Sequence, residues 1–158
     1  MKKIASFTVN HETLLPGLYV SRRDAVGENA VTTFDLRFTR PNLEPVMDTA
    51  PVHAIEHLGA TYLRSDPEWG ERVIYFGPMG CRTGFYLILS GAPESKDALG
   101  LVMRMLRFVA EYEGKIPGAS PRECGNYLDM NLQMAKYHAR RYLELLESGA
   151  EDRLRYPE

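Results

Sequence analysis

The amino-acid sequence predicts a single α+β domain in which a largely antiparallel sheet carries helices packed on one face. Strand-like runs come first, and later strand-like runs alternate with long stretches of helical periodicity. Connections between neighbouring strand-like runs are mostly short, which favours antiparallel pairs because a parallel pair needs a long crossover. The chain has 158 residues, 44% of them hydrophobic, and no Gly/Ser-rich linker divides it. We therefore expect one domain over residues 1–158 with an ordinary core.

Two short runs near the start of the chain, residues 17–23 and 30–40, are rich in β-branched or aromatic residues. The sequence Val-Gly-Glu-Asn between them is typical of a turn, so we expect a hairpin. Polar and apolar residues alternate over residues 33–38 of the second run. The apolar side chains should face a core, and Asp35 and Arg37 should face the other side of the sheet.

The next segment, residues 51–64, is predicted to form a helix. A proline stands at its first position, which suits a first helical turn, and Asp48 or Thr49 can serve its start. Two further strand-like runs follow at residues 71–76 and 84–90. A loop containing Gly-Pro-Met-Gly-Cys separates these two runs.

Two long helices complete the predicted fold. Residues 93–114 carry apolar residues at roughly helical spacing. Residues 120–123 read Ser-Pro-Arg-Glu, a capping box with a proline just inside, so the final helix should begin there. Gly125 and Asn126 can interrupt its first turn, and Gly149 suits its end. The apolar face of this helix should carry Leu128, Leu132, Ala135, Ala139, Leu143 and Leu146.

Charge and hydropathy exclude several classes of protein. The 19 basic and 21 acidic residues give a formal net charge of -2, without a long run of either sign. The pairs Arg22-Arg23 and Arg140-Arg141 are too small for a nucleic-acid groove or an acidic-membrane surface. The apolar stretch after the first lysines is too short for a signal peptide, and the run at residues 85–89 is far below a membrane span. We expect a cytoplasmic protein that binds neither nucleic acid nor membrane.

A pair of histidines gives the sharpest chemical signal. His53 and His57 are four residues apart in a predicted helix, so both imidazoles lie on one face and can reach one metal ion. Glu56 projects beside them, where a carboxylate can move protons without being a ligand. The alternative is a surface helix with two exposed histidines, because this spacing also occurs by chance.

A catalytic site of the zinc type needs a third protein ligand and leaves one position open. His11, His138, both cysteines and the carboxylates are the remaining candidates. Cys124 is favoured because it is expected at the start of a helix, where the positive helix end stabilises a thiolate. Two histidines and one cysteine suit zinc or ferrous iron. The alternative is that Cys124 is a buried, inert cysteine.

The second cysteine, Cys81, lies in a glycine-rich loop at residues 77–84, where backbone can approach a ligand closely. The neighbouring Arg82 could favour its thiolate, which makes Cys81 a candidate acid/base group. An ordinary cysteine in a hairpin turn is an equal alternative. Two cysteines in a cytosolic chain are more often free, catalytic or metal-bound than bridged, so a disulfide between Cys81 and Cys124 is a minor alternative.

Five motifs occur in a fixed order from near the start of the chain to the final predicted helix. They are Ser6-Phe7 with His11, Phe-Asp-Leu-Arg-Phe at 34–38 followed by Pro41-Asn42, His53-x-x-Glu56-His57-Leu58, Pro-Met-Gly-Cys-Arg-Thr-Gly-Phe-Tyr at 78–86, and Glu-Cys-Gly-Asn-Tyr at 123–127. Together these motifs resemble the S-ribosylhomocysteine lyase family, the LuxS proteins of bacterial quorum sensing. The set is far more specific than His-x-x-Glu-His alone.

The resemblance implies a role for each of eight side chains. His53, His57 and Cys124 would hold the metal, Glu56 and Cys81 would form the acid/base pair, and Ser6, His11 and Arg37 would contact the substrate's sugar. The metal would be ferrous iron, often replaced by zinc or cobalt in purified protein. The substrate would be S-ribosylhomocysteine, and the products homocysteine and 4,5-dihydroxy-2,3-pentanedione, the precursor of autoinducer-2. The resemblance also implies a homodimer with active sites at the subunit interface.

Two other functions share part of this pattern. Inverted-motif metallopeptidases also contain His-x-x-Glu-His and take a glutamate far downstream as third ligand, for which Glu123 is the candidate. That function leaves Cys81 unexplained, and the chain is short for such a peptidase. A non-enzymatic, metal-stabilised domain would fill all four metal positions with protein ligands, and Cys81 would then be the fourth.

Overall fold

A four-stranded sheet forms the centre of the computed structural model, which describes residues 3–149 and 151–157. Its strands are β1 (Gly17–Val26), β2 (Asn29–Arg37), β3 (Val73–Pro78) and β4 (Gly84–Ser90). The strand order is β1-β2-β4-β3, and each neighbouring pair is antiparallel. The predicted antiparallel sheet is therefore confirmed, and β2 and β4 occupy its two central positions.

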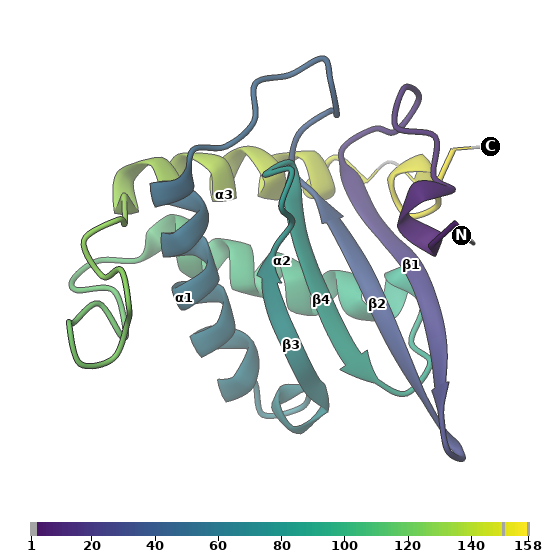
Figure 1. Ribbon diagram of the computed structural model, residues 1–158, viewed down its shortest axis with the longest axis horizontal. Coiled ribbons are helices and arrows are strands. Elements are labelled where there is room, and N and C mark those ends of the chain that lie inside the picture. Colours follow the sequence, from purple (N-terminus) through teal and green to yellow (C-terminus); the bar gives the residue numbers. More distant parts are fainter. Residues whose placement is uncertain (1–2, 150, 158) are drawn as a thin grey trace.

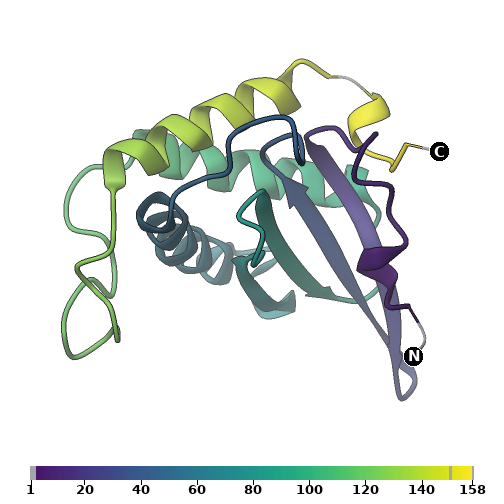
Figure 2. The same cartoon turned by 45° about the horizontal axis from the view of Figure 1, so that its top comes forward.

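Three α-helices pack against one face of this sheet, as Figures 1 and 2 show. They are α1 (Thr49–Ser65), α2 (Ser95–Glu111) and α3 (Leu132–Glu147), and short 3-10 turns occur at η1 (Ala5–Phe7), η2 (Gly70–Arg72) and η3 (Glu151–Arg153). In Figure 1, α2 and α3 pass behind the sheet, and no α-helix of the described residues covers the face toward the viewer. The α+β prediction with helices on one face is confirmed. None of the described helices is long and apolar enough to cross a membrane.

The predicted hairpin between β1 and β2 has a two-residue turn. Val26 pairs with Asn29, and Gly27 between them has a φ of 61°, in the left-handed region that glycine adopts without steric cost. The second strand ends at Arg37, three residues earlier than the sequence predicted. The chain then leaves the sheet, because the amides of Phe38 and Thr39 both donate to the carbonyl of Thr83.

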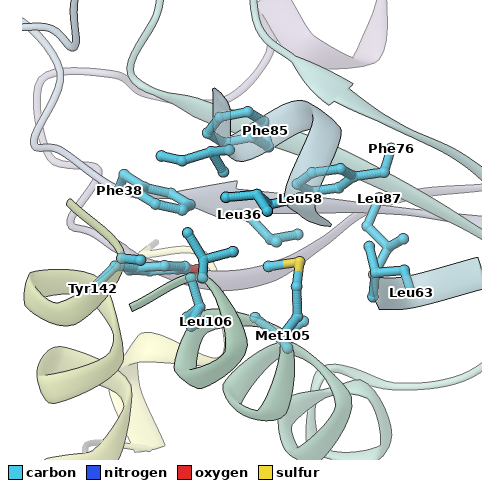
Figure 3. Packing of buried hydrophobic residues seen from close by; sticks show 14 of the residues in the cluster. Leu36, Phe38, Leu58, Leu63, Phe76, Phe85, Leu87, Met105, Leu106 and Tyr142 are labelled. Carbon is cyan, nitrogen blue, oxygen red and sulfur yellow. The ribbon is translucent and has the colours of Figure 1, made fainter. Parts of the chain in front are cut away.

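The inner face of the sheet packs on the helices to form the core that Figure 3 shows. Its labelled members are Leu36, Phe38, Leu58, Leu63, Phe76, Phe85, Leu87, Met105, Leu106 and Tyr142. The rings of Phe38 and Tyr142 stack with their centroids 4.2 Å apart. The hydroxyl of the fully buried Tyr142 donates to the carbonyl of Gly17 at 2.7 Å, so this polar atom is satisfied inside the core.

The outer face of β2 differs from a solvated strand face. The apolar residues of β2 face the core as predicted, and Asp35 and Arg37 point to the other side. Both polar side chains are nevertheless buried, with only 1% and 3% of their surfaces exposed. One face of β2 therefore packs on the apolar core, and its other face carries a buried ion pair where solvent was expected.

The predicted start of the last helix is wrong. The side chains of Ser120 and Glu123 are hydrogen-bonded to each other, but residues 120–131 make turns and α3 begins at Leu132. Asn131 is the N-cap, and its side chain accepts from the amide of Met134 at 3.0 Å. The Asn131 amide donates to the carbonyl of Ala50, which ties the segment before α3 to the start of α1. Leu128, placed by the periodicity on the core face, is 80% exposed.

Asp66 joins the end of α1 to α2 through its buried carboxylate. Oδ1 accepts from the amides of Glu68 and Trp69, each at 3.0 Å, and Oδ2 accepts from Arg104 at 2.8 Å. Burial raises the pKa of Asp66, but the hydrogen bonds from Arg104 and the two amides outweigh burial and lower it below its ordinary value. The folded protein thus favours the ionised form of Asp66.

We expect Asp66→Asn to lower the free energy of unfolding at pH 7 by about 1 kcal/mol, because Arg104 loses its charged partner while the amide oxygen can still accept from the backbone. Since the folded-state pKa lies below the ordinary 3.8, the wild-type advantage should be complete above pH 3.8 and should disappear as pH falls through the lower folded-state value. Urea unfolding of both proteins at several pH values measures this difference. A difference that stays constant at acid pH would refute the role of the charge.

Candidate metal centre and active site

The side chains of His53, His57 and Cys124 come together at one end of the helical layer. One ligand atom from each residue can be chosen so that all three atoms lie within 4.8 Å of one another. Cys124 Sγ is 3.4 Å from His53 Nε2, and the two imidazole centroids are 4.8 Å apart. The structure therefore brings the three predicted ligands into a candidate metal site, contributed by α1 and by the segment before α3.

The packing of α1 fixes the direction in which its histidines point. Ala54, Ile55 and Leu58 are fully buried in the core and set the rotation of the helix about its axis. His53 and His57 lie one turn apart at the edge of this buried face and are half-buried. The helix can therefore present both rings to one ion while its neighbouring residues hold it in the core.

Backbone carbonyls orient both imidazoles. His53 Nδ1 lies 2.9 Å from the carbonyl oxygen of Asp129, and His57 Nδ1 lies 2.8 Å from that of Pro117. A carbonyl can only accept, so Nδ1 carries the hydrogen in both rings and Nε2 keeps its lone pair for a metal. This arrangement is the one expected for histidines that bind a metal through Nε2.

Cys124 lies in a turn and not at the start of a helix, so the helix-dipole argument for its thiolate is wrong. Its Sγ instead accepts a hydrogen bond from the amide of Asn126 at 3.5 Å. An amide that donates to sulfur stabilises the negative charge of a thiolate, which is the form that binds metals. The segment between α2 and α3 thus supplies one ligand and both orienting carbonyls.

The donor set distinguishes between the sequence-based alternatives. Among the described residues, His53, His57 and Cys124 form the only cluster of three side chains with metal-ligand spacing. Cys81 is outside this cluster and both cysteines are free, which argues against a four-ligand structural site and against a disulfide. The Glu123 carboxylate instead accepts from Ser120 at 2.5 Å. Three protein ligands match a catalytic centre, which leaves the fourth metal position to water or substrate.

Cys81 is an exposed residue in the turn between β3 and β4. Its Sγ lies 3.1 Å from Thr83 Oγ1, and Arg37 Nη1 donates to the same Oγ1 at 2.6 Å and approaches Sγ to 4.0 Å. Because Thr83 accepts from Arg37, its own hydroxyl hydrogen is free to point at the sulfur. Sequence reasoning named Arg82 as the nearby cation, but the guanidinium at the thiol belongs to Arg37.

This environment makes Cys81 more acidic than an ordinary cysteine. Partial burial raises the pKa of the thiol, but hydrogen bonds from Thr83 and the positive charge of Arg37 outweigh burial and lower the pKa below its ordinary value. A larger share of Cys81 is therefore thiolate near neutral pH, as an acid/base or nucleophilic group requires.

Arg37 is held in place by Asp35 on the same strand. Nε donates to one carboxylate oxygen at 3.1 Å and Nη2 to the other at 2.6 Å, which forms a two-pronged ion pair. Burial alone lowers the pKa of Arg37, but the Asp35 carboxylate outweighs it and raises the pKa. The guanidinium thus stays charged although it is buried beside Cys81.

The turn that carries Cys81 and the start of α1 lie at the same end of the molecule (Figure 1). The amide of Met47, just before α1, donates to the carbonyl of Arg82 at 3.1 Å and ties the two segments together. Glu56 lies on α1 between the two histidines and is half-buried. No hydrogen bond or ion pair within the described residues engages its carboxylate, so it is free to bind a proton or a substrate hydroxyl.

Two predicted substrate contacts lie elsewhere. Ser6 lines a hollow of about 180 Å³ on the outer face of the sheet, together with Tyr75 and Tyr86. His11 is half-buried, and its Nδ1 donates to the carbonyl of Val9 at 2.9 Å. The metal ligands belong to the helical layer, on the other side of the sheet. One chain therefore does not gather all eight predicted site residues in one place.

Sequence reasoning missed several groups that shape the site. Asp35 and Thr83 both lie within the motifs at 34–38 and 78–86. An acidic and a basic residue two positions apart on one strand face, as in Asp35 and Arg37, can indicate an ion pair. The carbonyls of Pro117 and Asp129 carry no sequence signal, because every residue has a carbonyl.

The fold and the site define a metal-dependent enzyme with a three-residue candidate metal site and a separate acidic thiol. The family model S-ribosylhomocysteinase (LuxS) matches residues 4–152, and the chain belongs to this family. The S-ribosylhomocysteine lyase of Clostridium acetobutylicum is 60% identical over 158 residues, all of both chains, and that of Finegoldia magna is 57% identical over the same extent. The S-ribosylhomocysteine lyase of Borreliella burgdorferi is 51% identical over 157 residues, 99% of this chain and all of the relative.

Gly118 packs directly against one of the predicted ligands, which allows a test of the orienting carbonyls. A Cβ at position 118 would lie 3.0 Å from His57 Nδ1, and its φ of +72° strains any other residue. We expect Gly118→Ala to displace His57 from the Pro117 carbonyl and to speed metal release to a chelator about tenfold.

The matched control is Gly114→Ala, which carries a comparable backbone strain, with φ of +106°, but meets no atom within 4 Å. Metal content and the rate of release to a chromogenic chelator are measured for both variants. Equal release from the two variants would show that the contact with His57 does not hold the metal site together.

Proposed function

We propose that the protein is an S-ribosylhomocysteine lyase that cleaves S-ribosylhomocysteine to homocysteine and 4,5-dihydroxy-2,3-pentanedione, the precursor of autoinducer-2. The observation that carries this proposal is a His-His-Cys cluster that could hold a metal, together with a separate acidic thiol in the same chain. Full-length identity of 50–60% to proteins named S-ribosylhomocysteine lyase supports it. In this proposal residues 1–158 act as one catalytic domain.

The metal would be held by His53, His57 and Cys124, whose nitrogen and sulfur donors suit ferrous iron, with zinc or cobalt as substitutes. We propose ferrous iron as the native ion. The ion would supply Lewis-acid polarisation of the carbonyl and hydroxyl oxygens of the sugar.

The Cys81 thiolate and the Glu56 carboxylate are the groups that we propose move protons. Each isomerisation step removes a proton from one sugar carbon and returns a proton to its neighbour, so the carbonyl moves from C1 to C2 and then to C3. Cys81 is suited to accept a proton because Arg37 and Thr83 stabilise its thiolate. Glu56, without a partner in the described chain, is suited to relay protons between hydroxyl oxygens.

The same groups complete the cleavage. With the carbonyl at C3, the proton on C4 becomes acidic, and its removal expels the thiolate of homocysteine from C5. The C4–H and C5–S bonds break, a C4–C5 double bond forms, and the leaving sulfur takes a proton. The resulting enol tautomerises to the dione without any oxidant or reductant.

We propose that Ser6, His11 and Arg37 contact the sugar and that a homodimer completes the site. Ser6 is on the outer face of the sheet, whereas the metal ligands are in the helical layer, so a partner chain is the simplest means of joining them. The outer face also leaves large apolar side chains in solvent, with Ile74 48% and Tyr75 46% exposed. A second copy of the chain that packs on this face would cover these side chains.

Two free cysteines favour a reducing compartment. Cys81 and Cys124 are both unbridged, and the proposed chemistry needs each of them as a thiolate. We therefore propose a cytoplasmic location, where thiols remain reduced.

Substrate turnover tests the proposed function directly. Purified protein is loaded anaerobically with ferrous iron, mixed with S-ribosylhomocysteine, and thiol release is followed with a chromogenic reagent. We expect release from wild type, loss of both metal and turnover in His57→Ala, and retained metal with at least about a hundredfold slower turnover in Cys81→Ala and Glu56→Gln. No release from metal-loaded wild type would refute the lyase activity.

Metal analysis of Cys124→Ala and Glu123→Ala separates this proposal from a metallopeptidase. The lyase site requires that Cys124→Ala loses the metal. It also requires that Glu123→Ala keeps the metal, because the Glu123 carboxylate accepts a hydrogen bond from Ser120 and is not a ligand. The opposite result would identify Glu123 as the third ligand and support peptidase chemistry.

The dimer has its own test. We expect wild type to sediment at twice the 17.9 kDa chain mass and Tyr75→Glu to sediment as a monomer, because a charge would be buried in the proposed interface. Tyr137→Glu is the control, because Tyr137 is 51% exposed but lies on α3, in the helical layer. A dimeric Tyr75→Glu would mean that the outer face is not the interface.

A further inference from the structure

The end of the chain folds back onto β1. Tyr156 stacks on Tyr19 with ring centroids 4.7 Å apart and an interplanar angle of 21°. Arg153, in η3, donates to the carbonyl of Pro16 at 3.0 Å, just before β1 begins. Figures 1 and 2 show this last segment, in yellow, beside the start of β1. Tyr156 is thereby held over the outer face of the sheet.

The Tyr156 hydroxyl lies at one end of a continuous hydrogen-bond chain to Cys81. The hydroxyl donates to Asp35 Oδ2 at 2.8 Å, and the Asp35 carboxylate pairs with Arg37. Arg37 donates to Thr83 Oγ1, which lies 3.1 Å from Cys81 Sγ. Each link is shorter than 3.2 Å, and the chain connects the last residues of the protein to the turn between β3 and β4.

We propose that Tyr156 is a positioning residue for the reactive thiol: its hydroxyl holds the Asp35 carboxylate so that Arg37 keeps its charge directed at Cys81. This inference rests on the proposed role of Cys81 as an acid/base group. Tyr156 acts through Asp35 and Arg37 and is not assigned a contact with substrate.

The charge balance at Asp35 gives the physical reason. The buried carboxylate has lost its hydration, and burial raises its pKa, while Arg37 and the Tyr156 hydroxyl lower it. The hydroxyl withdraws part of the negative charge on Oδ2, which leaves more of the positive field of Arg37 for Cys81. Without the hydroxyl, the carboxylate would draw more strongly on Arg37, and the Cys81 thiolate would lose stabilisation.

Tyr156 can act as a constant donor because it does not ionise near neutral pH. Burial and the Asp35 charge raise its pKa far above the ordinary value for tyrosine, so the hydroxyl keeps its hydrogen. Other groups face the two ends of the chain of hydrogen bonds. Tyr86, Arg37 and Thr83 face Cys81, and His11, Tyr19 and Tyr142 face Asp35.

The test compares Tyr156→Phe with wild type in the metal-loaded protein. The substitution removes one oxygen and keeps the ring that stacks on Tyr19. Iodoacetamide alkylation is followed from pH 5 to 10, roughly the range around the thiol pKa, and peptide mass spectrometry reports Cys81 separately from Cys124. We expect the apparent pKa of Cys81 to rise by about half a unit, equivalent to about threefold slower alkylation at neutral pH.

The matched control is Tyr112→Phe, which removes a hydroxyl that donates to the carbonyl of Lys115, away from the hydrogen-bond chain. Its Cys81 profile should coincide with that of wild type. Coincident profiles for Tyr156→Phe and wild type, or a lower pKa in the variant, would overturn the inference. Because alkylation needs no substrate, this result is independent of whether the protein cleaves S-ribosylhomocysteine.

Discussion

The buried ion pair between Asp35 and Arg37 is the interaction on which the outer face of the sheet and the surroundings of Cys81 depend. Removing two charges from water costs several kcal/mol for each ion, and close, two-pronged hydrogen bonds offset this cost only when their geometry is held. The central position of β2 provides that constraint, since β1 and β4 bond to both of its edges. Thr83 accepts a further hydrogen bond from the Arg37 guanidinium, and Tyr156 donates one to the Asp35 carboxylate. The ion pair loses its hydration when it is buried, but it fixes the positive charge of Arg37 beside Cys81.

A different constraint shapes the metal centre. The histidines are four residues apart, and the helix fixes their separation, but each imidazole can still rotate about its own bonds. The carbonyls of Pro117 and Asp129 remove that freedom and choose the tautomer. Because these carbonyls come from the segment that also carries Cys124, one loop must dock correctly on α1 for all three ligands to converge. The bond from Asn131 to Ala50 fixes the end of that loop.

Whether the sequence predicts a feature of this structure depends on how far apart in the sequence the interacting residues are. The hairpin, the order of elements and the position of His53 and His57 on one face of a helix depend on residues close in sequence, and the structure confirms them. The start of α3 was wrong, because a capping box signals a turn and tertiary contacts decide whether a helix continues. The cation at Cys81 is 44 residues away in sequence, and Tyr156 is 121 residues from Asp35. No local pattern predicts such pairs, and the family resemblance named Arg37 only as a contact of the substrate's sugar.

The two cysteines have different surroundings, and these suit the two roles proposed for them, metal ligand for Cys124 and acid/base group for Cys81. Cys124 lies 3.4 Å from His53 Nε2 and accepts from a backbone amide, which suits a sulfur that gives its electrons to a metal. Cys81 meets a hydroxyl and a guanidinium, and neither can take its electron pair, so the thiolate stays available for protons. If the two surroundings were exchanged, the metal would occupy the sulfur that is needed as a base, and the sulfur that is needed as a ligand would lie away from the metal. The proposed chemistry therefore requires that Cys81 is not a metal ligand, and the pairing of β3 with β4 holds its turn apart from the ligand cluster.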